Sequence, residues 1–266
     1  MAPRIITLAN QKGGVGKTTT AINLATALAA IGERVLILDL DSQGNASTGL
    51  GINRNDREVS TYDVLVGDAT VAEAAIMTGV PRVALIPSTI DLSGVELAIA
   101  QQPDRAFKLR NAFKGLHELL IDGQPLTYVL IDCPPSLNLL TVNALVAADA
   151  VLVPMQCEFF ALEGLSQLLQ TIEQIRTTLN PRLAIQGVVM TMFDRRNSLS
   201  EQVLNDVRQT MGSLVYDTVI PRNVRLSEAP SYGKPALLYD LKCAGSQAYL
   251  RLATEVIRRE RQLNAA

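Results

Sequence analysis

The chain has 266 residues, of which 48% are hydrophobic and 19% are charged, and its formal net charge is −2. This length and composition fit a globular protein with a well-buried core, and no apolar run approaches the ~20 residues that a membrane-spanning helix needs. One histidine, three scattered cysteines and no tryptophan argue against a histidine–cysteine metal centre, a disulfide framework and a stacking surface for single-stranded nucleic acid.

Short apolar runs alternate with helical patterns along the whole chain. Strands are expected at residues 4–10, 34–40, 82–88, 128–135, 150–156, 184–193 and 215–221. Helices are expected at residues 17–31, 60–67, 71–77, 113–120, 137–148 and 245–266. Runs that are apolar on both sides are typical of parallel strands covered by helices on each face. The alternation therefore predicts a doubly wound α/β fold with a mostly parallel sheet flanked by helices.

A glycine-rich loop lies between the first strand and the first long helix, which is the context of a phosphate-binding loop. Its glycines would let backbone N–H groups turn toward phosphate oxygens, and the helix N-terminus would add partial positive charge. Lys17 is expected to reach the β- and γ-phosphates, and the Thr18 hydroxyl to bind Mg²⁺. The residues expected to contact the nucleotide here are Gly13, Gly14, Val15, Gly16, Lys17, Thr18 and Thr19.

Three acids end two of the expected strands, at the edge of the sheet where the loop would lie. Asp39 and Asp41 close the strand at 34–40, and Asp132 follows four apolar residues in the strand at 128–135. An acid in the latter position can hold Mg²⁺ through water, as in a Walker B motif. The alternative for each acid is that it caps a helix.

Two of these motifs carry a family resemblance. The run K-G-G-V-G-K-T at 12–18 resembles the deviant phosphate loop of the ParA/MinD superfamily of ATPases, and D-L-D-S-Q-G-N at 39–45 is similar to its D-x-D-x-Q-G-N pattern, with Ser42 where proline is frequent. The resemblance implies that Lys12 crosses a dimer interface to the phosphates bound by the partner copy. It also implies ATP and Mg²⁺ as cofactors, Asp41 as the residue that positions or activates water, and Asp39 as a support of the Mg²⁺ shell. Lys12 could otherwise be an ordinary surface lysine.

Longer segments at 157–169, 191–203, 220–240 and 245–253 resemble the chromosomal ParA-type partition ATPases, also called Soj. This resemblance implies one ParA-type ATPase domain over 1–266, an ATP-dependent homodimer that binds double-stranded DNA nonspecifically, and a ParB-type centromere-binding partner. The protein would be cytoplasmic and nucleoid-associated, and scattered cysteines fit a reducing cytosol. Pro221, Arg222 and Asn223 would lie near the adenine. The alternative for these three is a plain turn.

Basic residues are unevenly distributed. Residues 187–266 contain 11 Lys or Arg and 8 Asp or Glu, whereas the preceding residues contain 13 and 18. Together with the resemblance, this excess suggests a DNA-binding face, although each residue could also be an ordinary surface cation. The candidates are Arg195, Arg196, Arg225, Lys234, Lys242 and Arg251.

Two other functions are compatible with the same fold. One is a MinD-like membrane-associated positioning ATPase that uses the last helix as its anchor, but beyond Ile257 only Leu263 is bulky and apolar. The other is a small-molecule enzyme such as an ATP-dependent ligase of the dethiobiotin synthetase kind, since a fold does not fix a function. Cys133 follows Asp132 and is expected to be a small buried residue, not a ligand of an iron–sulfur cluster.

Overall fold

The computed structural model describes residues 2–158 and 161–265, with side chains through Arg261. Phe159 and Phe160, in the family-like segment at 157–169, lie outside the described residues, and the side chain of Leu263 lies outside the described side chains.

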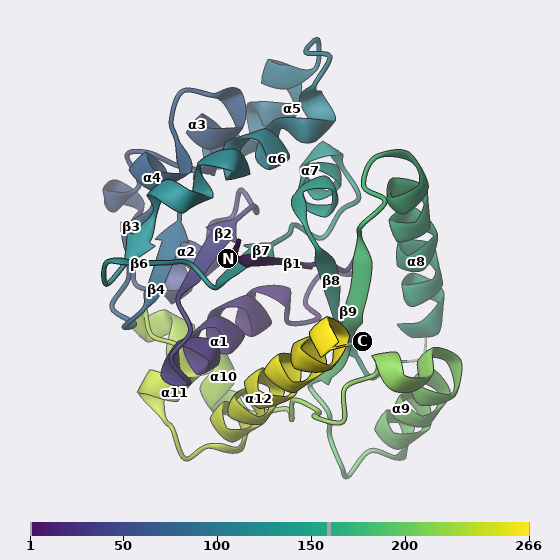
Figure 1. Cartoon of the computed structure of the whole chain (residues 1–266). Helices are drawn as coiled ribbons and strands as arrows, with labels where there is room; N and C mark the ends of the chain where they lie inside the picture. The colour runs from purple at the N-terminus through teal and green to yellow at the C-terminus, as the bar shows by residue number, and fades with distance from the viewer. Residues whose placement is uncertain (1, 159–160, 266) are drawn as a thin grey trace.

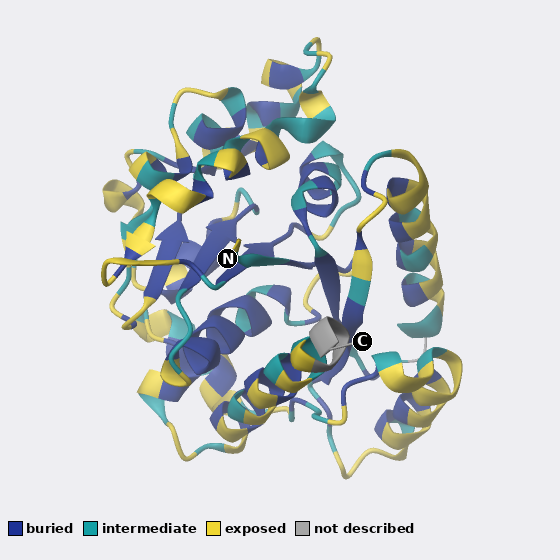
Figure 2. Cartoon of the chain, viewed as in Figure 1, coloured by how far each residue is buried: buried dark blue, intermediate teal, exposed yellow. Residues whose placement is uncertain are grey.

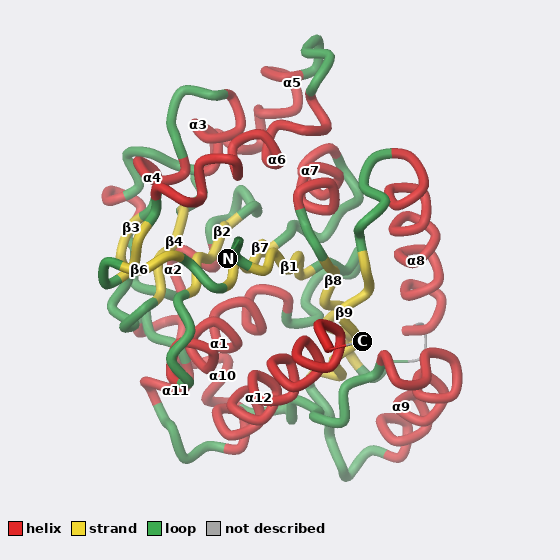
Figure 3. Tube along the Cα trace, in the orientation of Figure 1, coloured by secondary structure: helices red, strands yellow, loops and turns green. Residues whose placement is uncertain are grey.

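A central sheet of seven strands runs through the molecule (Figures 1 and 3). Its order is β3-β4-β2-β7-β1-β8-β9, and every neighbouring pair is parallel except β3 and β4. The strands are β1 (Arg4–Leu8), β2 (Val35–Asp39), β3 (Ile76–Met77), β4 (Val83–Ile86), β7 (Tyr128–Asp132), β8 (Ala150–Gln156) and β9 (Ala184–Thr191). A separate two-stranded hairpin is formed by β5 (Leu120–Ile121) and β6 (Gln124–Pro125).

Helices cover both faces of the sheet. The α-helices are α1 (Lys17–Ala30), α2 (Asn45–Gly49), α3 (Thr61–Val66), α4 (Val71–Ala74), α5 (Val95–Ile99), α6 (Lys108–Ala112), α7 (Leu139–Ala147), α8 (Ala161–Thr178), α9 (Ser198–Met211), α10 (Val224–Glu228), α11 (Ala236–Tyr239) and α12 (Ala244–Ala265). In Figure 1, α1 and α12 lie together on one face, α3 to α7 lie on the other, and α8 and α9 lie beside the β8–β9 end. No helix among the described residues is both long and apolar enough to cross a membrane.

Alternate side chains of one strand pack into the hydrophobic cores on opposite faces of the sheet, which explains the continuous apolar runs in the sequence. Val35 and Ile37 of β2 pack with α1 and α12, whereas Leu36 and Leu38 pack with α3 to α7. Figure 2 shows the middle of the central sheet buried, with β2, β4 and β7 buried along their whole length, whereas the edge strand β3 and the start of β9 include exposed residues. At about 25 cal/mol per Å², this two-sided burial is the main stabilising term of the fold.

The expected strand at 215–221 is wrong. This segment joins the β9 region through two isolated bridges, at Val215 and Pro221, and through a hydrogen bond from Ile220 N to the Met190 carbonyl at 2.8 Å. Between them, the backbone N–H groups of Asp217 and Thr218 donate to the Glu255 carboxylate of α12, at 2.9 and 3.0 Å. A side chain from a distant helix therefore takes the donors that a continuous ladder would have used.

Two expected helices are shorter than predicted. The segment at 71–77 forms α4 over its first four residues and then the edge strand β3. The segment at 113–120 is a 3-10 helix over Phe113–Glu118, and Leu120 already belongs to β5. His117 is exposed, and a ring nitrogen lies 3.0 Å from the Lys114 carbonyl. The cause in both cases is local pairing at the sheet edge and hairpin, which a helical period does not reveal.

Candidate active site

The loop between β1 and α1 is fixed by two side chains outside its glycine run. The Asn10 amide oxygen accepts from Lys12 N at 3.0 Å, and its nitrogen donates to the Pro154 carbonyl at 2.8 Å. At the other end, the Thr191 hydroxyl donates to the Val15 carbonyl at 2.8 Å. Gly16 stands before α1 with φ of 88°, a left-handed conformation that favours glycine. The loop is therefore held in shape by the ends of β1, β8 and β9.

Lys17 lies inside this loop. Its side chain is buried, with 7% of the residue exposed, and its ammonium donates to the Asn10 and Lys12 carbonyls, both at 3.0 Å. Burial lowers the pKa of Lys17, while the nearby carboxyl groups of Asp132 and Asp41 act in the opposite direction. The ammonium is thus held against the backbone of the loop that the sequence assigns to phosphate.

Lys12 of the same loop lies on the surface. Its side chain is half exposed, at 50%, and forms an ion pair with Glu158, which follows β8. An exposed pair of this kind contributes little to stability, so another anion can compete for the ammonium. The two lysines of the loop therefore occupy different surroundings, one enclosed and one on the surface.

Asp132 is the acid with no hydrogen-bond partner. It is fully buried, and neither carboxylate oxygen is paired with any described residue. Burial and the charge of Asp39 raise the pKa of Asp132 well above its ordinary value, while the Thr18 hydroxyl and Lys17 lower it. An unpaired buried carboxylate is costly unless a cation satisfies it. Its place beside Thr18 fits a Mg²⁺ ion.

Mg²⁺ would need further ligands at this site. No group of three or more His, Cys, Asp or Glu side chains within the described part of the chain could hold a metal ion by itself. Mg²⁺ commonly takes one or two protein ligands and completes its shell with water and substrate phosphates. The donor set of Thr18 and Asp132 is therefore of the kind that binds Mg²⁺ together with a nucleotide.

Asp39 has a structural role that the sequence left open as helix capping. Its Oδ2 accepts from Ser47 N at 2.8 Å and from the Ser47 hydroxyl at 2.7 Å, which anchors α2, and its Oδ1 accepts from Asp41 N at 3.3 Å. Burial raises the pKa of Asp39 to about 6, although the hydrogen bonds from Ser47 oppose this shift. Both oxygens are thus engaged, and a place for Asp39 in the Mg²⁺ shell stays a prediction.

Asp41 begins the turn that leads into α2. It is partly exposed, its Oδ1 accepts from Gln43 N at 3.0 Å, and its carbonyl accepts from Gly44 N at 2.9 Å. The carboxylate is therefore held at the rim of the loop by a local turn and remains accessible to water.

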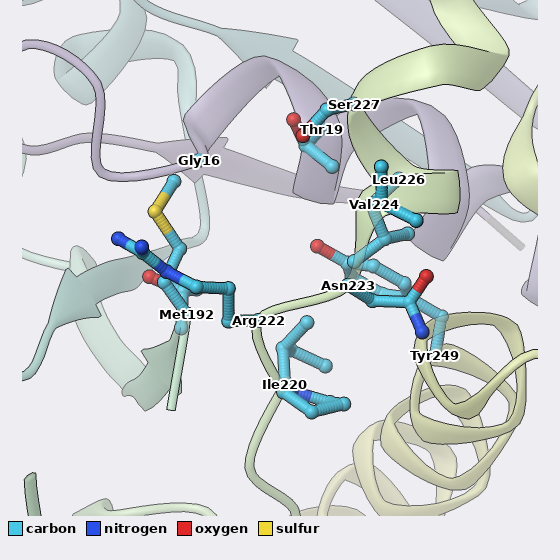
Figure 4. Close-up of a pocket in the computed structure, with 12 residues that line it drawn as sticks. Gly16, Thr19, Met192, Ile220, Arg222, Asn223, Val224, Leu226, Ser227 and Tyr249 are labelled. Carbon is cyan, nitrogen blue, oxygen red and sulfur yellow. The ribbon is translucent and has the colours of Figure 1, made fainter. Parts of the chain in front are cut away.

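A cavity of about 330 Å³ adjoins the loop on the side of β9 (Figure 4). Its lining includes Gly16 and Thr19 together with the three residues predicted to lie near a base, Pro221, Arg222 and Asn223. The other lining residues are Thr191, Met192, Ile220, Val224, Leu226, Ser227 and Tyr249. In Figure 4, Met192 and Arg222 lie on one side of the cavity and Asn223, Val224 and Tyr249 on the other. The phosphate loop and the expected base-side loop thus meet at one hollow.

Asn223 also forms the turn that was the alternative to a contact with the base. Its side-chain oxygen accepts from Arg225 N at 2.9 Å and caps α10. One acceptor position is thereby occupied, and the side-chain NH₂ remains available as a donor to a ligand.

Comparison with known proteins identifies the family. A family model described as an AAA domain matches residues 3–185. The chromosome partitioning protein ParA of Caulobacter vibrioides is 66% identical over 262 residues, which cover 98% of this chain and 97% of that protein. The sporulation initiation inhibitor protein Soj of Bacillus subtilis is 51% identical over 253 residues, covering 95% and 98%. The chain belongs to the ParA/Soj-type ATPases of the ParA/MinD superfamily.

Solved structures confirm the predicted fold class for this ParA/Soj-type chain. Cobyrinic acid a,c-diamide synthase from Mycobacterium smegmatis with bound ADP and magnesium matches with a TM-score of 0.83 and 36% identity, covering 97% of this chain and 96% of that one. The cell division ATPase MinD of Pyrococcus furiosus matches with a TM-score of 0.79 and 30% identity, covering 97% and 99%.

The basic residues predicted to bind DNA in this ParA/Soj-type chain do not form one cluster. Arg195, Arg196 and Arg251 line a hollow of about 860 Å³. Arg225 forms ion pairs with Glu228 at 2.8 Å and with Asp240 at 3.5 Å. The exposed Lys242 lies near them, because its backbone N–H donates to the Asp240 carboxylate at 3.1 Å. Lys234 instead lines a smaller cavity with Thr18 and Thr19.

The sequence reasoning missed several residues that shape the site. Asn10 has a weak local signal, because it is a polar residue directly after an apolar strand. No local sequence signal marks Thr191, Met192 or Tyr249, because they reach the loop and the cavity from segments that are distant in the chain. Tyr249 of α12 is hydrogen-bonded to Thr20 of α1 at 3.1 Å, which ties the last helix to the helix that begins at the loop.

Proposed function

We propose that this chain is a switch ATPase that dimerises when it binds ATP and Mg²⁺, binds double-stranded DNA nonspecifically in that state, and drives chromosome or plasmid partition. A ParB-type centromere-binding protein is its partner, and ATP hydrolysis releases it from DNA. The whole of 1–266 acts as one ATPase domain. The observation that carries the proposal is the different exposure of two lysines in one loop, since Lys17 is buried within it and the Lys12 side chain is half exposed on its surface.

The electrostatic argument concerns a pair of facing nucleotides. Lys17 neutralises the β- and γ-phosphates of its own nucleotide. Two ATP molecules brought face to face repel each other, and a cation supplied by each copy to the other's phosphates lowers that cost. Of the two lysines, Lys12 is the one whose side chain can reach a second copy of the chain. Its only ion pair among the described residues is the exposed one with Glu158, which another anion can replace.

The residues around the bound nucleotide have separate roles in this proposal. Thr18 and Asp132 hold Mg²⁺, which supplies charge stabilisation to the phosphates when it is bound. Asp41, at the accessible rim, positions the attacking water, and the Asn223 amide donates to the adenine in the cavity. Support comes from the unpaired carboxylate of Asp132 and from the convergence of both loops on one hollow.

DNA binding follows from charge and from dimerisation. Arg195, Arg196 and Arg251 surround one hollow, and a dimer doubles the number of phosphate contacts that a monomer can make. Each contact contributes about −0.9 to the slope of log affinity against log salt, so doubling them makes binding much tighter at moderate salt. Contacts to phosphates alone are indifferent to base sequence.

A membrane-associated function is less well supported. The apolar side of α12, including Tyr249, Leu252 and Val256, is fully buried against the α1 side of the core. Arg259 of the basic end lies over the Tyr216 ring at 4.0 Å and donates to the Val215 carbonyl at 2.7 Å. Both the apolar face and a basic residue that an anchor would use are therefore engaged within the fold.

A small-molecule enzyme is the remaining alternative, since one structural neighbour is a cobyrinic acid a,c-diamide synthase. The higher identity to a chromosome partitioning protein over 98% of this chain favours partition.

The deciding experiment is a gel shift with random-sequence duplex DNA in the presence of ATP, ADP or no nucleotide, each with Mg²⁺ and at several salt concentrations. Binding should require ATP and weaken steeply with salt. Equal binding in all three nucleotide states would contradict the switch. A liposome pull-down with ATP, run in parallel, would reveal a membrane-associated function.

A further inference from the structure

Arg57 is a buried cation beside the turn that carries Asp41. Only 7% of it is exposed, although arginine is rarely buried without partners. Its Nη1 donates to the Ser88 carbonyl at 2.9 Å, and its Nη2 donates to the Thr48 hydroxyl and to the Ile52 carbonyl, both at 2.8 Å. One guanidinium thus joins α2, the loop after it and the segment that follows β4.

The same guanidinium packs directly on Gly44, the residue before α2. Gly44 has φ of 64°, and a Cβ at this position would lie 2.2 Å from Arg57 Nη1 and 3.0 Å from the Ser88 carbonyl. Gly44 N in turn donates to the Asp41 carbonyl at 2.9 Å. The turn from Asp41 to Gly44 is therefore bounded on its inner side by Arg57, with no room for even a methyl group.

A second set of hydrogen bonds fastens α2 from the sheet side. Ser47 donates to Asp39 through both its backbone N and its hydroxyl, and its hydroxyl oxygen accepts from Ser88 N at 3.1 Å. Burial lowers the pKa of Arg57, and the nearby Asp39 carboxylate opposes that shift. The helix after the Asp41 turn is thus clamped between a buried carboxylate and a buried guanidinium.

We propose that Arg57 is a positioning residue for hydrolysis, which holds Asp41 in place through Gly44 and α2. This inference rests on the proposed ATPase function. The planar fork of arginine satisfies three separate acceptors at once, which a lysine ammonium does not reproduce. Arg57 belongs neither to the phosphate loop nor to the lining of the cavity beside it. Its loss should therefore slow turnover and leave nucleotide affinity nearly unchanged.

The test compares Arg57→Ala and Arg57→Lys with Arg54→Ala, a matched control at an exposed arginine three residues earlier. Three quantities are measured for each: ATPase kcat in the presence of DNA and partner, the Kd of a fluorescent ATP analogue, and amide hydrogen exchange of residues 41–48. Misplacement of a catalytic group by about 1 Å can cost about 100-fold in rate. Arg57→Ala should lose at least about tenfold in kcat, with little change in Kd and faster exchange in 41–48. Arg54→Ala should match the wild type.

Arg57→Lys keeps the charge and the aliphatic stem, so it replaces Arg57→Ala if the latter does not fold. It should show the same separation of kcat from Kd. Wild-type kcat in both Arg57 variants, equal losses in kcat and affinity, or unchanged exchange in 41–48 would each overturn the proposal. If the wild-type protein hydrolyses no ATP, the proposed function fails, and the proposal for hydrolysis is overturned with it, whereas the exchange data still report whether Arg57 holds the turn.

Discussion

Asp39 and Asp132 are opposite each other in register on the adjacent strands β2 and β7, and both are fully buried. Their environments nevertheless differ, because Asp39 accepts hydrogen bonds from Ser47 while Asp132 has no partner among the described residues. The pairing places one satisfied and one unsatisfied carboxylate at the carboxyl end of the sheet. This asymmetry is what distinguishes a structural acid from a candidate magnesium ligand.

Asp132→Asn should separate stability from Mg²⁺ binding. Without nucleotide or Mg²⁺, the variant should be more stable than the wild type, by at least about 1 kcal/mol in the free energy of unfolding, because a buried charge without a partner is removed. ATP with Mg²⁺ should stabilise it less than the wild type. Urea unfolding with and without MgATP measures both effects. Asp122→Asn, at an exposed position, is the control, and a full MgATP effect in Asp132→Asn would exclude Asp132 as a ligand.

Lys12→Ala should abolish ATP-dependent dimerisation and leave ATP binding largely intact. The reason is that the Lys12 side chain lies on the surface, whereas Lys17, which is buried within the loop, remains in place. Light scattering with ATP and Mg²⁺ measures the mass, and nucleotide titration measures the affinity. The exposed Lys114→Ala provides the control for loss of a surface lysine. A dimer that persists in Lys12→Ala would refute the role in trans.

Asp41→Ala should retain ATP binding and lose about 100-fold or more in turnover, which is the usual contribution of a positioned acid–base group. Steady-state phosphate release is the measurement, and Asp68→Ala, at an exposed acid after α3, is the control. Unchanged turnover would remove Asp41 from the mechanism.

Arg195→Ala and Arg196→Ala should weaken ATP-dependent DNA binding to different extents. Arg196 is held by Asp194 through two hydrogen bonds, at 3.0 and 2.8 Å, so part of its charge is already neutralised. Arg195 is exposed in the same hollow. The single change at Arg195 should therefore weaken binding more, and the double change should reduce the salt slope by up to about 3.6 for four lost contacts in a dimer.

The measurement is DNA binding over a salt series, with dimerisation checked by light scattering. Arg110→Ala combined with Lys114→Ala, two exposed cations on the α6 side, removes the same charge elsewhere. DNA binding that survives the double change at 195 and 196 would exclude that pair.

Two glutamates of α12 should give opposite pH dependences of stability. Burial raises the pKa of Glu260, although Arg4 and Tyr128 donate to it. The folded state therefore binds the Glu260 proton more tightly than the unfolded state does. The contribution of Glu260 to the free energy of unfolding is full below the unfolded-state pKa, near 4.5. It is lost as pH rises through the higher folded-state pKa. Glu260→Gln should remove this fall in stability with rising pH.

The contribution of Glu255 to stability changes with pH in the opposite direction. Burial alone would raise its pKa, but the N–H groups of Asp217 and Thr218 and the charge of Arg259 outweigh it, and the net pKa is lowered. Its contribution is therefore present above the unfolded-state value and is lost as pH falls through the lower folded-state pKa. Urea unfolding of Glu255→Gln and Glu260→Gln between acidic and neutral pH checks both signs. Slopes that change in the same direction in the two variants would contradict this account.

The sequence by itself determined the features that depend on neighbouring residues. The apolar runs predicted the parallel strands, and the glycine run with Lys17 and Thr18 predicted the loop before α1, since backbone preference and burial pattern are local properties. The acids at 39 and 132 followed from their places at strand ends. Helix capping was an open alternative for Asp39, but its bonds to Ser47 of α2 could not be recognised, because Ser47 approaches it only after the chain has turned.

The tertiary structure alone decided the features that depend on distant contacts. Glu255 of α12 breaks the expected strand at 215–221, Thr191 pins the loop, and Arg57 reaches Ser88 across the turn. The six basic residues separate into different surroundings for the same reason. Each of these outcomes depends on which segments the folded sheet brings together, and no local period or motif in one sequence encodes that contact.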